Sequence, residues 1–152
     1  MLIYNLYFAV ETFSELDSST PLPINKNYDY WAPLIKHFLN KSDTIEIHCW
    51  NGEGEVIKEL TSLHKNSFEI VVDECLTIFK SQLNSSIIEF LLCDFLNDSN
   101  QFKWFSLFLS YGTKPIFDSG HWGTEFFSPA ATKNDIEFIK QVMPVDTNVH
   151  LY

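Results

Sequence analysis

The hydrophobic and polar positions of the chain follow two different periods. Apolar residues at alternate positions predict strands, whereas apolar residues three and four positions apart predict helices. Residues 2–10 are rich in aromatic and aliphatic side chains and predict a first strand. Residues 43–50 alternate, so that Ile45, Ile47 and Cys49 face one side and the residues between them face the other. We expect this second strand to bury one face.

Helical spacing is clearest after residue 30. The first predicted helix begins beside the capping candidate Asp29 and ends near residues 40–42. A second begins after the NGEGE segment, where Glu53 and Glu55 suit the positive N-terminal end of a helix dipole. The two apolar stripes consist of Trp31, Leu34, Ile35, Phe38 and Leu39, and of Val56, Ile57, Leu60 and Leu63.

A last helix is predicted near residue 135. Thr132 and Asp135 form a capping-box-like pair, in which Asp takes the place of the usual Glu. An apolar stripe follows, and Pro144 stops the helix because proline cannot continue it. The stripe consists of Ile136, Ile139, Val142 and Met143.

Two segments are harder to assign from the pattern. Residues 67–82 fit a helix by the spacing of their apolar residues, but the β-branched residues at their start favour a strand. We favour a strand at 67–72, followed by a short helix that begins at Asp73. Residues 11–27 carry polar residues and two prolines, and they predict a surface loop of a length typical of functional or mobile loops.

The second half of the chain predicts a meander. Residues 86–96 and 101–111 are apolar runs separated by the turn-forming sequence NDSN, and together they predict a hairpin. The first run is apolar on both faces, which is typical of a central strand. Gly112 turns the chain into a third strand at 114–118, and residues 125–128 continue that strand or form a fourth. The predicted buried face of the second run consists of Phe105, Leu107, Leu109 and Tyr111.

This order of elements predicts an α+β fold, with a mostly antiparallel sheet, a C-terminal meander at about 86–128, and helices packed on one face. The chain length fits a single globular domain over residues 1–152. An apolar fraction of 45%, with 14 Phe, argues against disorder.

The charge balance indicates what kind of partner the chain suits. The chain has 20 acidic and 10 basic side chains, for a net charge of −10, and every basic residue is Lys. Arg forms two parallel hydrogen bonds with a phosphate group and is the residue best suited to bind phosphate. An acidic chain without Arg is therefore a poor candidate for direct binding to nucleic acid or to an anionic membrane. The same negative field would steer a basic protein partner toward the surface. The alternative is that the charge serves solubility alone.

The cysteines and the start of the chain bear on the compartment. Cys49, Cys75 and Cys93 cannot all pair within one chain, and their apolar neighbours predict buried free thiols in a reducing cytoplasm. The first residues lack the basic segment of a signal peptide, and the apolar runs are too short to span a membrane. We therefore expect a cytoplasmic protein. Abundant Lys, Asn, Ile and Phe are typical of an AT-rich bacterial genome.

The segment DSGHWGTEFFSP, at residues 118–129, is the first candidate site. It contains Asp118, His121, Trp122 and Glu125. Three interpretations are open: a catalytic loop in which a carboxylate orients His121, a binding hairpin, or ordinary turn chemistry in which glycines supply special backbone conformations. Because no catalytic motif lies near the segment, turn formation and binding are favoured over catalysis.

The stretch between Asp43 and Glu59 is the second candidate site. It holds five acidic residues and one Lys, with Trp50 in its middle on the polar face of a predicted strand. An aromatic residue surrounded by charge is typical of an interface anchor, although the following helix could instead cover it. The predicted partner-binding residues of the two sites are Glu46, Trp50, Glu53, Glu55, Asp118, His121, Trp122 and Glu125.

These features favour a binding protein over an enzyme. The main hypothesis is an immunity protein or antitoxin that blocks a basic toxin, for example a nuclease, by steric and electrostatic occlusion. One alternative is a small hydrolase or ligand-binding enzyme that uses His121, Asp118 and His48. Another is an adaptor or a subunit of an oligomeric complex. The scattered His residues and the lack of a CxxC pair predict no metal site, we expect no cofactor, and the oligomeric state does not follow from the sequence.

Overall fold

The computed structural model describes residues 2–15, 20–63 and 68–152. Over these residues the chain forms four helices, one eight-stranded sheet and a two-stranded ribbon, which confirms the predicted α+β class. The helices are α1 (Trp31–Leu39), α2 (Gly54–Leu63), α3 (Ser85–Cys93) and α4 (Lys133–Val142). The strands of the large sheet are β1 (Tyr4–Ala9), β4 (Thr44–Trp50), β5 (Glu69–Val72), β6 (Leu76–Gln82), β7 (Ser106–Tyr111), β8 (Lys114–Gly120), β9 (Glu125–Ala131) and β10 (Asn148–Leu151), and the ribbon pairs β2 (Thr12–Phe13) with β3 (Leu22–Pro23).

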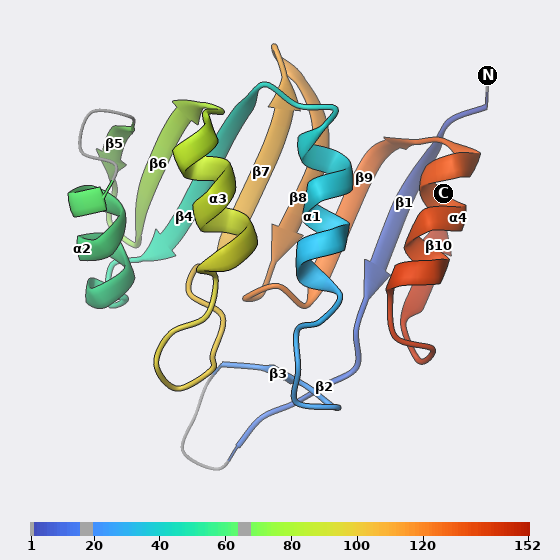
Figure 1. The fold of residues 1–152 in the computed structure, drawn as a ribbon, viewed down its shortest axis with the longest axis horizontal. Helices are drawn as coiled ribbons and strands as arrows, with labels where there is room; N and C mark the ends of the chain where they lie inside the picture. Colours follow the sequence, from blue (N-terminus) through green and yellow to red (C-terminus); the bar gives the residue numbers. More distant parts are fainter. Residues whose placement is uncertain (1, 16–19, 64–67) are drawn as a thin grey trace.

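Neighbouring strands of the large sheet run antiparallel, in the order β10-β1-β9-β8-β7-β4-β6-β5. The consecutive strands β7, β8 and β9 form the meander, and β1 pairs with the outer side of β9. Because β10 pairs with β1, the first and last strands lie side by side at one edge of the sheet (Figure 1).

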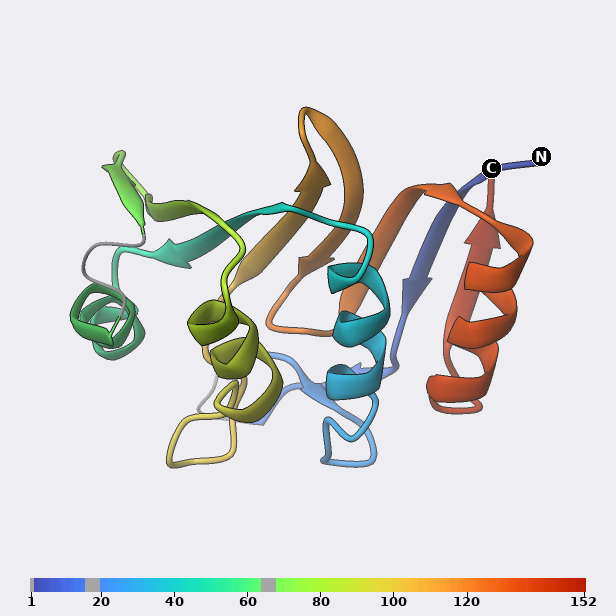
Figure 2. The same cartoon turned by 45° about the horizontal axis from the view of Figure 1, so that its top comes forward.

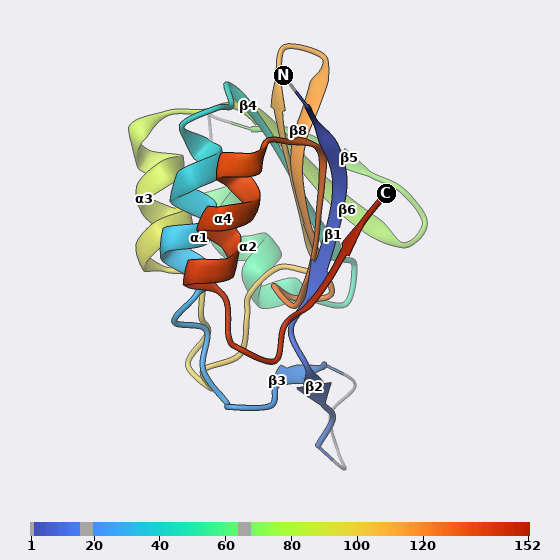
Figure 3. The same cartoon turned by 90° about the vertical axis from the view of Figure 1, so that its right-hand side faces the viewer.

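The helices lie on one side of the sheet. Figure 3 views the molecule from its right-hand side and places α1, α3 and α4 together on the same side of the strands. Figure 2 shows α2 near β5, at the end of the sheet opposite α4. Within the described parts of the chain no helix covers the other side, so the sheet is one layer of a two-layer fold. None of the described helices is long and apolar enough to cross a membrane.

The core between the two layers is built from alternate residues of the strands and the apolar stripes of the helices. On β4, Ile45, Ile47 and Cys49 are buried, as predicted. The fully buried Trp31 donates its indole N–H to the carbonyl of Leu91 at 2.9 Å, which ties α1 to α3. Burying each such large apolar side chain stabilises the fold by about 1.5–3 kcal/mol.

The predicted central strand at 86–96 is wrong, because residues Ser85–Cys93 form α3. Asn84 caps this helix, since its side-chain oxygen accepts the N–H of Ile87 at 2.9 Å. A short apolar segment that is buried on several sides has the same sequence pattern as a helix or as a central strand. The predicted pairing of two strands through NDSN is therefore wrong as well, because this sequence lies between α3 and β7. The predicted turn is present, since an isolated antiparallel bridge joins Leu96 to Phe102 across it.

The predicted strand at 67–72 is confirmed as β5 over Glu69–Val72; Phe68 precedes the strand, and residue 67 lies outside the described residues. The short helix expected after it is wrong, because Leu76–Gln82 form β6. The Asp73 carboxylate accepts the N–H groups of Cys75 and Leu76 at 2.8 and 2.7 Å, which closes the turn between the two strands. The same short-range bonds are available at a helix start, which makes Asp at this position ambiguous.

The start of the chain fits its predictions in part. The first predicted helix is confirmed as α1, but Asp29 does not cap it: Tyr30 is the N-cap residue and makes no side-chain capping bond. The predicted loop at 11–27 contains the short strands β2 and β3, and residues 16–19 lie outside the described residues.

The last part of the chain shows three outcomes. Residues 125–128 belong to a fourth strand, β9. The capping box at the start of α4 is confirmed, because the side chains of Thr132 and Asp135 each accept the other residue's backbone N–H. Leu107 and Leu109 are buried as predicted, but Tyr111 is 63% exposed because it lies at the tip of the β7–β8 hairpin. No sequence pattern predicted β10.

The three cysteines differ in exposure. Cys49 is buried as predicted, and burial, together with the nearby Glu53 carboxylate, raises the pKa of its thiol to about 12. Cys75 and Cys93 are exposed, so the prediction that they are buried is wrong. Their apolar neighbours in sequence mislead because Cys75 lies in the β5–β6 turn and Cys93 is the last residue of α3.

Candidate functional site

The DSGHWGTEFFSP segment closes the β8–β9 hairpin with an unusual turn. His121, Trp122 and Gly123 have φ values of +48°, +54° and +73°, so three successive residues adopt the left-handed conformation. This conformation costs a residue other than glycine about 1–2 kcal/mol. At Gly123 glycine is required, because an added Cβ would lie 2.7 Å from the Phe102 ring.

Surrounding groups hold this turn in place. The N–H of Trp122 donates to the carbonyl of Phe105 at 3.0 Å, and the hydroxyl of Thr124 donates to the carbonyl of His121 at 2.8 Å. The buried hydroxyl of Tyr30, in the layer of helices, donates to the Gly123 carbonyl. The side chains of His121 and Trp122 therefore project from a fixed backbone.

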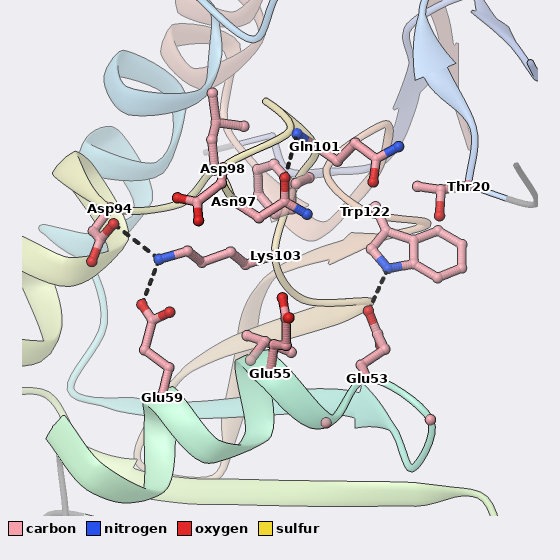
Figure 4. A pocket seen from close by; sticks show the side chains of 15 residues that line it. Thr20, Glu53, Glu55, Glu59, Asp94, Asn97, Asp98, Gln101, Lys103 and Trp122 are labelled. Atoms are coloured by element: carbon pink, nitrogen blue, oxygen red, sulfur yellow. Dashed lines mark hydrogen bonds and ion pairs between the residues drawn. The ribbon is translucent and has the colours of Figure 1, made fainter.

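Next to the turn lies a cleft of about 510 Å³, which we call the acidic cleft. Its walls come from the start of α2, the loop that joins α3 to β7, and the β8–β9 turn (Figure 4). Of the described residues that line it, five carry carboxylates and one carries an ammonium group. The lining residues are Thr20, Gly52, Glu53, Gly54, Glu55, Val56, Glu59, Asp94, Leu96, Asn97, Asp98, Gln101, Phe102, Lys103 and Trp122.

Lys103 is the only basic residue among the described residues that line the acidic cleft, and its charge is already matched. Its buried ammonium donates to the carboxylates of Glu59 and Asp94, the second at 2.9 Å (Figure 4). The ammonium also lies over the Phe90 ring. Burial lowers the pKa of Lys103, but the two carboxylates outweigh it and raise the pKa overall. Lys103 thus stays protonated and joins α2 to the loop after α3.

Glu53 fixes the other end of the acidic cleft. One carboxylate oxygen accepts the indole N–H of Trp122 at 2.9 Å (Figure 4). The other accepts the backbone N–H of Trp50 at 2.8 Å. Burial raises the pKa of Glu53, and these two hydrogen bonds only partly oppose it. Glu55 and Asp98 differ from Glu53: both are exposed, and among the described residues neither carboxylate has a hydrogen-bond or ion-pair partner.

An aromatic group connects the acidic cleft to the outer side of the sheet. The Phe105 ring lies with its centroid 4.9 Å from the rings of both Trp50 and Trp122, and 5.6 Å from the ring of His121. His121 in turn places Nδ1 2.9 Å from a carboxylate oxygen of Glu125. Trp50 is 38% exposed, so α2 does not cover it.

The outward-pointing side chains on the sheet side without helices form what we call the open face. The strand register arranges them in two adjacent rows. One row runs Glu69, Lys80, Glu46, Phe108, Asp118, Phe127, Tyr7 and His150. The other runs Val71, Ile78, His48, Ser106, Gly120, Glu125, Ala9 and Asn148.

Two of the carboxylates on the open face, Glu46 and Asp118, differ in their partners. Glu46 Oε1 lies 2.6 Å from His48 Nε2. Asp118 has no hydrogen-bond or ion-pair partner among the described residues, and burial raises its pKa to about 6. The two side chains are separated by Phe108 in the same row.

The structure brings the eight predicted partner-binding residues into two adjoining regions. Glu53, Glu55 and Trp122 line the acidic cleft, and Glu46, Asp118 and Glu125 lie on the open face. Trp50 and His121 lie between the regions, in contact with Phe105.

Sequence reasoning missed the loop side of the acidic cleft. Asp94, Asp98 and Lys103 were assigned to a strand end and a hairpin, so nothing placed them opposite α2. One signal was available: Asn84 before an apolar run is a helix-start pattern, and a helix there would have made the following segment a loop.

The residues of the enzyme alternative are not joined. His48 contacts Glu46, His121 contacts Glu125, and no hydrogen bond or ion pair among the described residues links either histidine to Asp118. Within the described part of the chain, no group of three His, Cys, Asp or Glu side chains is arranged to hold a metal ion. Comparisons with protein-family models, curated proteins and solved structures found no match to this chain.

Proposed function

We propose that this chain is an immunity protein or antitoxin that binds a basic toxin and blocks its active surface, with the acidic cleft as the principal contact. One observation supports the proposal: in the part of the chain that the structure describes, five carboxylates and a single ammonium group line one concave surface, and the ammonium is already paired within it. The cleft therefore keeps a strong negative potential, which attracts lysine and arginine side chains.

Electrostatic steering would first bring the partner to the acidic cleft, and charge-assisted hydrogen bonds would then hold it there. The net charge of −10 speeds the encounter with a basic protein, most strongly at low salt. A lysine or arginine side chain of the partner then enters the acidic cleft, where Glu55 and Asp98 offer unpaired carboxylates. The exposed edge of Trp50, beside Phe105, supplies apolar contact area next to these charges.

The rigidity of the acidic cleft favours tight binding. Lys103 bridges Glu59 and Asp94, and the Glu53–Trp122 hydrogen bond ties the β8–β9 turn to the start of α2. Because Glu53, Glu59 and Asp94 are held before the partner arrives, the walls of the cleft lose little conformational entropy on binding. The bound protein then occludes the toxin without chemistry, in the bacterial cytoplasm where the toxin is made.

A charge-reversal experiment tests the proposal. The product of the neighbouring gene is purified, and its Kd is measured by calorimetry against the wild-type chain and the double variant Glu55→Lys, Asp98→Lys. We expect the double variant to bind at least 100-fold more weakly. The matched control reverses two exposed carboxylates away from the cleft, with Glu89→Lys on α3 and Glu137→Lys on α4, and should bind within about threefold of wild type.

Two outcomes would contradict the proposal. If the cleft variant and the control variant weaken binding equally, net charge and not the acidic cleft governs the interaction. If the neighbouring protein does not bind and deletion of this gene leaves growth unchanged while that protein is expressed, the immunity function is wrong.

A further inference from the structure

The open face contains a hollow of about 170 Å³, which we call the sheet hollow, and it shares no lining residue with the acidic cleft. It lies over β1, β7, β8 and β9, the centre and one flank of the sheet. The lining residues are Tyr7, Ser106, Phe108, Asp118, Ser119, Gly120, Glu125, Phe126 and Phe127.

The residue sizes in the two rows explain why the sheet hollow exists. In one row Gly120 lies between Ser106 and Glu125, and a Cβ on Gly120 would meet only the Ser106 hydroxyl, at 3.9 Å. In the adjacent row Asp118 lies between two phenylalanines, Phe108 and Phe127. Side chains on one face of a sheet stand about 5 Å from their cross-strand neighbours, so two small residues beside two large rings leave a space.

The carboxylate in this space has no partner. Asp118 is half-buried, and among the described residues it makes no hydrogen bond or ion pair. A half-buried carboxylate without a donor is a costly state, because it has lost hydration without gaining a partner. The nearest charged groups do not relieve it: Glu125 is negative and contacts His121, and Glu46 contacts His48.

Among the described residues, no cationic side chain fills the sheet hollow. None of the lining residues that the structure describes is Lys, and Lys80 on β6 is the register partner of Glu46, with β4 and β7 between it and Asp118. The remaining titratable side chains facing this part of the sheet are Tyr7 on β1 and His150 on β10. The local charge around Asp118 above neutral pH is therefore negative.

The rings of the sheet hollow suit the same ligand chemistry as its carboxylates. Tyr7, Phe108 and Phe127 lie in the row that contains Asp118, and each is only partly buried. Aromatic faces attract ammonium and guanidinium groups by about 0.5–2 kcal/mol each, and they pack against alkyl chains. The volume of the hollow is comparable to the roughly 150 Å³ cavity that holds one benzene molecule, so it has room for one side chain.

From these observations we infer that the sheet hollow is a binding site for a single alkylammonium or alkylguanidinium group, with Asp118 as its counter-ion and the three rings as its walls. The site is separate from the acidic cleft, and it would bind such a cation whether or not the cleft contacts a toxin. The ligand chemistry is that of a lysine or arginine side chain or of a free alkylamine.

Titration with small cations tests this site directly. The purified full chain is titrated at pH 8 and constant ionic strength with n-butylammonium and n-butylguanidinium, while NMR follows the Asp118 carboxyl carbon and the ring protons of Tyr7, Phe108 and Phe127. We expect saturable shifts with a Kd in the millimolar range, as befits a ligand with so few atoms. A third arm uses n-butanol, which has the same chain without the charge and should bind at least tenfold more weakly.

Two variants separate charge from shape. Asp118→Asn removes the charge and keeps the side-chain size, and should weaken n-butylammonium binding at least tenfold. Gly120→Val fills the hollow and leaves the charge, and should abolish saturable shifts; the backbone there does not require glycine. The control Glu55→Gln removes a carboxylate of the acidic cleft and should bind the cation within twofold of wild type.

A further titration, with a capped Gly-Lys-Gly peptide, distinguishes a partner's side chain from a free amine as the source of the cation. Binding of the peptide as tight as that of n-butylammonium assigns the site to a partner's side chain, and exclusion of the peptide assigns it to a free amine. Equal binding of cation and alcohol, or unchanged binding to Asp118→Asn and Gly120→Val, overturns the inference. Two results distinguish this inference from the proposed function: cleft variants that lose toxin binding and bind the cation normally, and variants that lose cation binding and bind the toxin normally.

Discussion

The indole N–H of Trp122 donates to the carboxylate of Glu53 at 2.9 Å, across 69 positions of sequence. This one bond joins the β8–β9 turn to the residue that precedes α2, so it fixes two walls of the acidic cleft. It also lies beside the Phe105 ring, which connects the cleft to the open face. The two candidate sites of the sequence, residues 118–129 and residues 43–59, are thus parts of one structural unit.

Trp122→Phe should remove this hydrogen bond and keep most of the packing. Because the bond involves a charged carboxylate, we expect the free energy of unfolding at pH 8 to fall by about 1.5–3 kcal/mol. Burial raises the pKa of Glu53, and loss of the indole donor should raise it further, so the deficit should shrink as the pH falls and Glu53 takes up a proton. Urea unfolding at pH 8 and pH 4 measures the difference.

The control for this variant is Trp50→Phe. Trp50 also contacts Phe105, but its indole N–H has no hydrogen-bond partner among the described residues. Its replacement should cost less than about 1 kcal/mol at either pH. A loss for Trp122→Phe that is the same at both pH values would show that packing and not the hydrogen bond accounts for it.

Gly123→Ala should destabilise the fold by about 2–4 kcal/mol. The alanine would have to keep a φ of +73°, and its Cβ would lie 2.7 Å from the Phe102 ring in the core. Gly112→Ala is the matched control, because Gly112 has a φ of +60° but open space around it, and should cost only about 1 kcal/mol. Thermal unfolding of both variants separates backbone strain from steric clash; equal losses would contradict the close contact with Phe102.

The parts of the fold that could be predicted are those where one pattern has one meaning. The alternation of Ile45, Ile47 and Cys49 fits only a strand with one buried face, and the Thr132–Asp135 pair fits only a helix start. Residues 86–96 have no such single meaning, because a helix buried on several sides and a central strand are both apolar throughout. The choice between them depends on which neighbours cover the segment, and those neighbours are distant in sequence.

The same distinction applies to the candidate site: some of its residues could be predicted from the sequence and others could not. Glu53, Glu55 and Trp122 could be selected from sequence because charge and aromatic residues are dense around them. Asp94, Asp98 and Lys103 lie in a segment of ordinary composition, and only the packing of α3 against α1 brings their loop opposite α2. The sheet hollow depends on the register of β7, β8 and β9, which no local pattern specifies.

The three thiols should differ sharply in reactivity. Cys75 and Cys93 are exposed, whereas Cys49 is buried and its pKa is raised to about 12, so it has almost no thiolate at neutral pH. Titration of the native protein with a chromogenic disulfide at pH 8 should release two equivalents within minutes and the third only after unfolding in denaturant. Cys49→Ala should leave the two fast equivalents unchanged; three fast equivalents in the native protein would contradict the burial of Cys49.

Asp118→Asn should stabilise the protein above neutral pH. Burial raises the pKa of Asp118 from 3.8 to about 6, so the folded state binds this proton more tightly than the unfolded state does. Stability is therefore lost as the pH rises from about 4 through 6, and it stays lower above that range. The shift corresponds to about 3 kcal/mol, but partial solvent contact reduces the expected gain to about 1–2 kcal/mol at pH 8.

Urea unfolding across pH 4–8 measures this gain. The variant should be more stable than wild type at pH 8 and about equal at pH 4, whereas the control Asp98→Asn, at an exposed position, should follow wild type throughout. A variant that is more stable and yet loses n-butylammonium binding is the pattern expected when a residue is kept for binding at the expense of stability. A variant less stable at pH 8 would show that Asp118 has a structural partner.

Asp135 should show the opposite pH dependence. Its side chain is 3% exposed and contacts His37 Nε2 at 2.7 Å, the Lys41 ammonium, and the backbone N–H of Thr132. Burial raises the pKa of Asp135, but the hydrogen bonds from Lys41, Thr132 and His37 outweigh it and lower the pKa to about 2. The carboxylate therefore contributes stability above the unfolded-state pKa near 4, and that contribution is lost as the pH falls toward 2.

Asp135→Asn tests this network with little change in shape. At pH 6 it removes the negative charge that pairs with Lys41 and His37 and the charge at the start of α4, and it replaces one of the two acceptor oxygens with an NH2 donor, so we expect a loss of about 2–4 kcal/mol. The difference from wild type should shrink steadily below pH 4, because wild-type Asp135 then approaches the neutral state that the amide imitates. Asp146→Asn, at an exposed position, is the control and should cost less than about 0.5 kcal/mol. Because α4 packs against α1 through this contact, a loss that persists undiminished at pH 3 would mean that shape and not charge holds the two helices together.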